Sequence, residues 1–132
     1  MPTVIEATIG KDHYKTIVSN GTLQITSDEP FVSGGTDQGF TPKELLYSAL
    51  ATCTCITLRM YADRKQWSLD SVKVTLSQER TSEETGGIEL EQNIELTGLL
   101  TTEQRYHLLE ISKRCPVHQL LTQPIHITNH LL

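Results

Sequence analysis

Three cysteines and one nearby histidine are the residues whose types and spacing suggest chemistry. Cys53 and Cys55 lie in one apolar stretch of the chain, and Cys115 directly precedes a proline, with His118 three residues further on. A thiolate is a nucleophile and a metal ligand, whereas an uncharged buried cysteine often only packs. The residue types alone therefore leave redox chemistry, metal binding and core packing open for each cysteine.

The expected helices restrict these alternatives. Cys55 follows Cys53 by two residues, about 200° around a helix, so the two side chains cannot point at one site. This divergence argues against a Cys₃His zinc site made of these two cysteines, Cys115 and His118. Pro116 suits the first position of a helix, and the free N–H groups of a helix start favour a thiolate at Cys115. His118 is expected to be a surface or capping residue, or else to lower the pKa of Cys115.

The stretch from Thr41 to Lys65 must position the first two cysteines. It begins with Thr41, Pro42 and Glu44, which together predict a capping box at the start of a helix. Apolar residues then recur at helical spacing, at Leu46, Ala49, Leu50, Cys53, Ile56 and Met60. The helix should be about 36 Å long, and its apolar character places it in the core. Its apolar segment is interrupted by threonines, a serine and Arg59, and we expect it to be short of a membrane span.

Strands are expected on both sides of this helix. Before the helix, an Asn20-Gly21 hairpin signal and alternating apolar residues predict an antiparallel meander. After the helix, alternating apolar residues predict a long hairpin with one solvent-exposed face. The expected strands are Thr3–Ile9, Tyr14–Ser19, Thr22–Thr26, Leu69–Arg80, Ile88–Leu96 and a last one over Pro124–His130. The further expected helices run from Thr101 to about Lys113 and over Val117–Leu121.

Two segments carry alternatives. The turn-rich loop from Ser27 to Phe40, which holds Phe31, is either a plain connector or a flexible apolar wall beside a site. The long hairpin is rich in glutamates that suggest either metal binding or a solvated strand face, and we favour the solvated face. These glutamates are Glu83, Glu84, Glu89, Glu91 and Glu95.

Composition bounds the class of protein. The chain has 132 residues, 37% of them hydrophobic and 20% charged, which predicts one globular domain over residues 1–132. The net charge is −5 and no basic run occurs, so we expect neither nucleic acid nor a membrane as a partner. No signal peptide is evident at the N-terminus, and three cysteines do not form a secreted disulfide framework. We therefore expect a cytoplasmic protein without a cofactor.

Two motifs together resemble the OsmC/Ohr family, the osmotically inducible and organic hydroperoxide resistance proteins. The first is GGTDQGFTPKELLYSALATCT, from Gly34 to Thr54, and the second is RCPVH, from Arg114 to His118. The resemblance implies an α+β fold in which antiparallel sheets wrap around a long central helix. It also implies an intertwined homodimer with active sites at the subunit interface.

The resemblance further implies roles for individual residues. Cys53 would be the peroxidatic cysteine, which attacks an organic hydroperoxide and becomes a sulfenic acid. Cys115 would resolve it to a disulfide, which an external dithiol reduces, and Cys55 would be a core residue. Glu44 is the candidate catalytic carboxylate. A pocket edged by Phe31, Phe40 and Leu46 would favour organic hydroperoxides, in defence against oxidative stress.

The chain also departs from the family pattern. Family peroxidases place an N-terminal arginine near the thiolate, and this chain has no arginine before Arg59. The position directly after the motif proline, where the family has its glutamate, holds Lys43, and this lysine, Lys11 or Lys15 could supply positive charge without arginine's two-pronged geometry. The pattern therefore indicates the broader OsmC-like branch. It leaves a redox-sensing or apolar-ligand-binding module as the alternative to a peroxidase.

Overall fold

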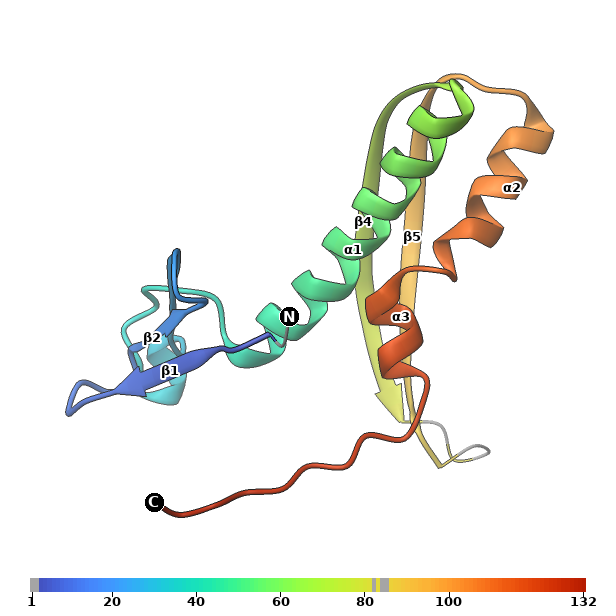
Figure 1. Ribbon diagram of the computed structural model, residues 1–132. Helices are drawn as coiled ribbons and strands as arrows, with labels where there is room; N and C mark the ends of the chain where they lie inside the picture. Colours follow the sequence, from blue (N-terminus) through green and yellow to red (C-terminus); the bar gives the residue numbers. More distant parts are fainter. Residues whose placement is uncertain (1–2, 82, 84–85) are drawn as a thin grey trace. The chain divides into compact units, whose positions relative to one another are not determined.

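The computed structural model describes residues 3–81, 83 and 86–132. The chain forms two compact units, one up to Tyr47 and one from Ser48 to Leu132, and each is described by itself. The elements are β1 (Glu6–Ile9), β2 (Thr16–Ser19), β3 (Gln24–Ser27), the 3₁₀ helix η1 (Phe31–Ser33), α1 (Pro42–Lys65), β4 (Ser68–Thr81), β5 (Ile88–Leu99), α2 (Thr102–Ser112) and α3 (Pro116–Leu121), and all but β3 and η1 are labelled in Figure 1. The predicted α+β class with antiparallel strands is confirmed, while the single domain stays a prediction.

The first unit contains a three-stranded antiparallel sheet in the order β1-β2-β3. The predicted hairpin turn is present, because the Asn20 side chain accepts hydrogen bonds from the backbone N–H groups of Thr22 and Leu23, at 2.9 and 2.8 Å. Apolar side chains of the meander, including Ile17 and Ile25, stay exposed. Among the described residues of this unit, therefore, none buries the face of the meander that alternation predicted to be apolar.

A single carboxylate fixes the loop that follows β3. Asp28 is buried, and its side chain accepts backbone hydrogen bonds from Tyr14, Glu29, Thr36 and Gln38. The Thr36 hydroxyl also donates to Asp28, at 2.7 Å, and this bond does most to hold the pKa of the carboxyl far below its usual range. Burial opposes that shift, and the backbone donors reinforce it. This loop, which the sequence left open as a plain connector or a flexible apolar wall, is thus tied to one buried charge.

In the second unit, β4 and β5 form the predicted long antiparallel hairpin, and α1 and α2 pack on one face of it (Figure 1). The core centres on Leu58 of α1 with Leu108 and Ile111 of α2. The other face of the hairpin is exposed to solvent, because exposed positions of β5 alternate with half-buried ones. Those exposed positions include Glu89, Glu91 and Glu95, whereas Glu84 lies outside the described residues.

Helix α1 has the predicted bounds but buries a different stripe. Its buried residues recur at every fourth position, at Leu50, Thr54, Leu58 and Ala62. Ile56 and Met60, expected on the core face, are 54% and 67% exposed. The expectation was wrong for them because the β4–β5 sheet covers only one side of the helix. The apolar segment was expected to be short of a membrane span, whereas by length and composition alone α1 could cross a membrane. Core helices of soluble proteins pass the same test.

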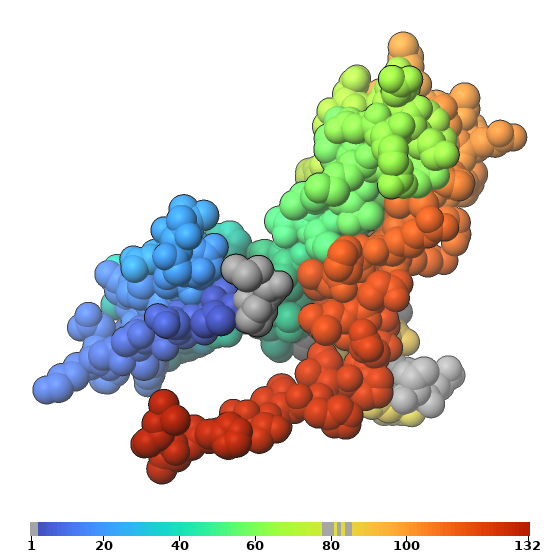
Figure 2. All heavy atoms as spheres, in the orientation of Figure 1, coloured from blue at the N-terminus to red at the C-terminus, as the bar shows by residue number. Residues whose placement is uncertain are grey.

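The end of the chain differs most from expectation. Helix α2 begins after the capping residue Thr101, and α3 begins at Pro116, close to the predicted starts. The strand predicted over Pro124–His130 was wrong, because residues 124–132 follow α3 as an exposed segment without helix or strand. Figures 1 and 2 show this segment extending away from α3. A strand needs a neighbouring strand to pair with, and the described part of this chain offers the segment none.

Candidate functional site

Two of the three cysteines come together in the second unit. Cys53 is half-buried in the middle of α1, and Cys115 is completely buried as the residue that caps α3. The Cys53 side chain lies close enough to Cys115 to raise the pKa of its thiol, and neither cysteine is in a disulfide. Residues from distant parts of the chain therefore form a thiol pair that can close to a disulfide.

The protonation of Cys115 departs from the helix-start expectation. Burial raises the pKa of the Cys115 thiol, and the hydrogen bond and charge of Cys53 raise it further. The backbone N–H groups of His118 and Val117 act in the opposite direction, the first donating to Cys115 Sγ at 3.4 Å. The helix start thus does what was predicted, but burial outweighs it. The net effect raises the pKa of Cys115, so the helix start does not by itself make this cysteine a thiolate.

Cys55 lies apart from this pair. Its thiol is directed at the β4 backbone, with Sγ 3.9 Å from the carbonyl oxygen of Val72. It lines a separate hollow together with Arg59 and Met60. Within residues 3–81, 83 and 86–132, no cluster of three or more potential metal ligands occurs. The three cysteines therefore do not converge.

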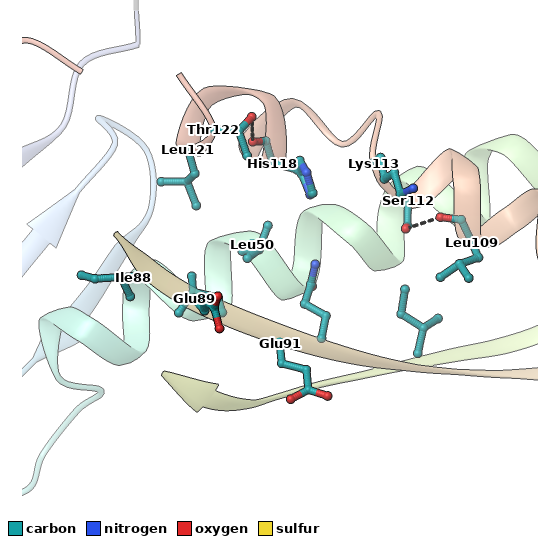
Figure 3. A pocket seen from close by; sticks show the side chains of 13 residues that line it. Leu50, Ile88, Glu89, Glu91, Leu109, Ser112, Lys113, His118, Leu121 and Thr122 are labelled. Atoms are coloured by element: carbon teal, nitrogen blue, oxygen red, sulfur yellow. Dashed lines mark hydrogen bonds between the residues drawn. The ribbon is translucent and has the colours of Figure 1, made fainter. Parts of the chain in front are cut away.

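A cavity of about 690 Å³ lies in the second unit, and neither Cys53 nor Cys115 is among the residues that line it. Its walls come from four elements of the second unit (Figure 3), and it is lined by Leu50, Ile88, Glu89, Leu90, Glu91, Gln92, Ile94, Leu109, Ser112, Lys113, His118, Leu121 and Thr122. Leu50 lies three residues before Cys53 and so shares its helix face. His118, whose backbone contacts Cys115, directs its ring into the cavity in Figure 3. Immediate neighbours of both cysteines thus form part of the cavity wall.

This cavity was not the pocket expected from the sequence. The expected lining residues Phe31, Phe40 and Leu46 belong to the first unit and are exposed there, so their part in a pocket stays a prediction. Leu50 was expected only as an apolar helix residue. The contribution of Gln92 was missed altogether, although a polar residue at an inward position of an alternating strand is a signal that could have revealed it.

The carboxylate and the lysines considered as partners of Cys53 also lie in the first unit. Glu44 forms the predicted capping box: its Oε1 accepts the Thr41 N–H at 2.9 Å, and its own N–H donates to Thr41 Oγ1 at 3.2 Å. Lys11 and Lys15 lie around the start of β2, and Lys43 is in the first turn of α1. A catalytic role for Glu44 or for a lysine stays a prediction.

Comparison with known proteins shows the relationship directly. Residues 35–129 match the family model described as OsmC-like protein. Solved structures similar to this chain include an OsmC-like protein from Mycoplasma pneumoniae, with a TM-score of 0.75 and 23% identity over 92% of this chain and 87% of that one. An organic hydroperoxide resistance protein OsmC from Legionella pneumophila has a TM-score of 0.65 and 22% identity, over 92% of this chain and 90% of that one.

The organic hydroperoxide resistance protein OhrB of Bacillus subtilis gives a TM-score of 0.60 and 19% identity, over 92% of this chain and 91% of its own. No curated protein matches the chain. At these identities the structural likenesses establish the fold, and the family model covers most of the sequence. The chain belongs to the OsmC-like protein family.

Proposed function

We propose that this protein is a thiol peroxidase that reduces organic hydroperoxides through Cys53 and Cys115. The observation that carries the proposal is the proximity of a half-buried thiol in α1 to a buried thiol at the start of α3, whose pKa is raised by burial and by Cys53. Family membership supports it, since two of the similar structures are hydroperoxide resistance proteins by name. The role would be defence against oxidative stress in the cytoplasm.

The difference in burial assigns the two cysteines to different steps. The thiolate of the more accessible Cys53 attacks the O–O bond; a sulfur–oxygen bond forms, the O–O bond breaks, and the alkoxide leaves and is protonated to an alcohol. Cys115 then attacks the sulfenic acid sulfur. The S–S bond forms, and the Cys115 proton leaves with the hydroxide as water. An external dithiol returns the pair to its reduced state by exchange.

The cavity lined by Leu50 and His118, each three residues from one of the two cysteines, supports an organic substrate. Aliphatic side chains from α1, β5 and α2 line it, among them Leu50, Leu90, Ile94 and Leu109. Its volume of about 690 Å³ lies in the range usual for small-molecule sites. The hydrocarbon part of a hydroperoxide would occupy this space, which hydrogen peroxide cannot fill.

We further propose that the active protein is a homodimer. Ile56 and Met60 expose one side of the central helix, and Ile127, in the unpaired C-terminal segment, is 79% exposed. A second copy of the chain would cover this helix face and give the C-terminal segment a strand to pair with. Sedimentation at micromolar concentration should give twice the mass of one chain, and a monomer would overturn this proposal.

The test of the peroxidase is dithiol-dependent consumption of cumene hydroperoxide by three single variants. Cys53→Ser should abolish turnover, because the nucleophile is lost. Cys115→Ser should stop the dithiol-dependent cycle after the sulfenic acid has formed. Cys55→Ser is the matched control and should keep wild-type turnover. Turnover that survives in Cys53→Ser would overturn the assignment.

One observation favours a second candidate function. No arginine precedes Arg59, so the chain lacks the N-terminal arginine that would activate a peroxidatic thiolate. The alternative is a redox sensor or ligand-binding module that forms the Cys53–Cys115 disulfide without efficient turnover. Slow, stoichiometric disulfide formation without steady-state consumption of hydroperoxide would favour this alternative over the peroxidase.

A further inference from the structure

One polar side chain interrupts the inward face of β5. The half-buried positions of this strand alternate along it, and Leu90, Ile94 and Leu96 are apolar, whereas the residue between the first two is Gln92. Gln92 lines the cavity of about 690 Å³ together with its neighbours on this face, Leu90 and Ile94. A side-chain amide carries an acceptor oxygen and an NH₂ group that only donates. Which of these two ends is free decides what the cavity can bind.

The acceptor end of the Gln92 amide is already paired inside the protein. Its Oε1 accepts a hydrogen bond of 3.1 Å from the hydroxyl of Thr54, a completely buried residue of α1. The same hydroxyl lies 3.0 Å from the carbonyl oxygen of Leu50, so its one proton is shared between two acceptors. The bond to Thr54 orients the amide, with its oxygen toward α1 and its NH₂ group on the other branch.

The donor end of the amide has no partner in the described part of the chain. Within residues 3–81, 83 and 86–132, no hydrogen bond leads from Gln92 Nε2 to another residue. Among the same residues, the only buried side-chain nitrogen or oxygen without a hydrogen bond is Arg59 Nε. Gln92 Nε2 is therefore not sealed in the core but reaches open space, and the hollow that Gln92 lines is the large cavity. An unpaired donor thus faces the cavity from an aliphatic wall.

The charges around the cavity favour an uncharged ligand. The ammonium group of Lys113, which lines the cavity, is already paired with Glu110, with Nζ 3.3 Å from Oε2. Glu91 also belongs to the lining and adds a negative charge. An anionic head group therefore gains little here, whereas a neutral carbonyl oxygen, which only accepts, matches an NH₂ group that only donates.

We propose that Gln92 is a ligand-binding residue whose amide N–H donates to the carbonyl oxygen of a neutral, otherwise apolar ligand. The aliphatic walls take the hydrocarbon part of such a carbonyl compound, and Gln92 selects for its oxygen. That a hydroperoxide bearing a carbonyl group is also the substrate of the cysteines rests on the proposed function. Binding of the carbonyl compound itself can be measured without any thiol chemistry.

The test is a cycle of two ligands and two proteins, with free ligand measured above solutions of reduced protein by headspace gas chromatography. Octan-2-one has the carbonyl, and 2-methyloct-1-ene has the same skeleton with a CH₂ group in place of the oxygen. Gln92→Met keeps the length of the side chain without a donor, and Thr54 keeps the Leu50 carbonyl as its acceptor.

The measured quantity is the affinity for the ketone relative to the alkene, and comparing this ratio between proteins cancels the different hydration of the two ligands. The ratio should fall about 3- to 10-fold from wild type to Gln92→Met, the effect expected of one neutral hydrogen bond. An unchanged ratio, or no binding of the ketone to wild type, would overturn the inference.

Two further variants of β5 isolate the donor. Gln92→Glu, at about pH 8 where a carboxylate is ionised, keeps an acceptor for Thr54 but has no N–H, so the ratio should fall as in Gln92→Met. Leu90→Met, on the same face of the strand, is the matched control and should keep the wild-type ratio. A ratio that persists in Gln92→Glu, or that falls equally in Leu90→Met, would overturn the assignment to the Gln92 donor. None of these results bears on disulfide formation by the cysteines, so failure here is distinct from failure of the peroxidase.

Discussion

Two substitutions of Glu44 can distinguish a structural role of this residue from a catalytic one. Its carboxylate accepts the Thr41 N–H at 2.9 Å, and its negative charge lies in the first turn of α1. Glu44→Gln keeps an acceptor for the capping box and removes the charge. Glu44→Ala removes both. If the capping box accounts for this residue, only stability should change.

The expected costs follow from these two contributions. Losing a carboxylate near a helix N-terminus costs about 0.3–1 kcal/mol, which is the expectation for Glu44→Gln. Losing an exposed hydrogen bond costs a further amount of about 0.5–1.5 kcal/mol, so Glu44→Ala should lose about 1–2 kcal/mol in total. Thr41→Ala, which removes the opposite half of the box, should fall in the same range.

Urea unfolding measures the stabilities, and the rate of hydroperoxide-driven disulfide formation measures the chemistry. We expect the rate in Glu44→Gln to remain within about twofold of wild type. Equal destabilisation by Gln and Ala would refute the capping argument. A rate lowered tenfold or more in Glu44→Gln, at the expected stability, would refute the purely structural role and establish the carboxylate as part of the active site.

Three further predictions concern the core, the loop and the thiols. Leu58→Ala should lower the free energy of unfolding by about 2–5 kcal/mol, because this side chain is completely buried in the core; a loss below about 1 kcal/mol in urea titration would contradict that packing. The folded-state pKa of Asp28 lies below its unfolded value of about 3.9, so its stabilising charge is present above that pH and lost as the pH falls through the folded pKa. Asp28→Asn should therefore be less stable than wild type at neutral pH but lose less stability on acidification, and an unchanged acid dependence would argue against the charge. Alkylation of Cys115, mapped by peptide mass, should reach half its maximal rate above the ordinary thiol pKa of about 8.5, and a lower midpoint would mean that the helix start dominates.

Local signals predicted local structure well. The capping residues Thr41 and Glu44 marked the start of α1, the Asn20-Gly21 pair marked the first hairpin, and Pro116 marked α3. Each of these signals acts within a few residues, so the rest of the chain does not alter it.

Features decided by distant residues were predicted less well. Ile56 and Met60 have the spacing of a core face, yet only the position of the β4–β5 sheet decides which side of α1 is buried. The C-terminal segment has a strand-like pattern but lacks a pairing edge in the described part of its own chain. Asp28 looked like one polar residue in a loop, and its role depends on donors from Tyr14 to Gln38.

The candidate site shows the same division. The two cysteine motifs identified Cys53 and Cys115, and the structure brings these thiols close together. The protonation of Cys115 could not be predicted, because the helix start and burial act in opposite directions and only the degree of burial decides between them. Nor could the sequence alone pair Gln92 with Thr54, since the register of β5 against α1 depends on the packed core.

The most direct test of the central claim is the intact mass of the reduced protein after treatment with one equivalent of cumene hydroperoxide. We predict the rapid loss of two hydrogens, with peptide mapping that joins Cys53 to Cys115, in wild type and in Cys55→Ser alike. An unchanged mass, or a disulfide that includes Cys55, would contradict the claim that Cys53 and Cys115 form the redox-active pair.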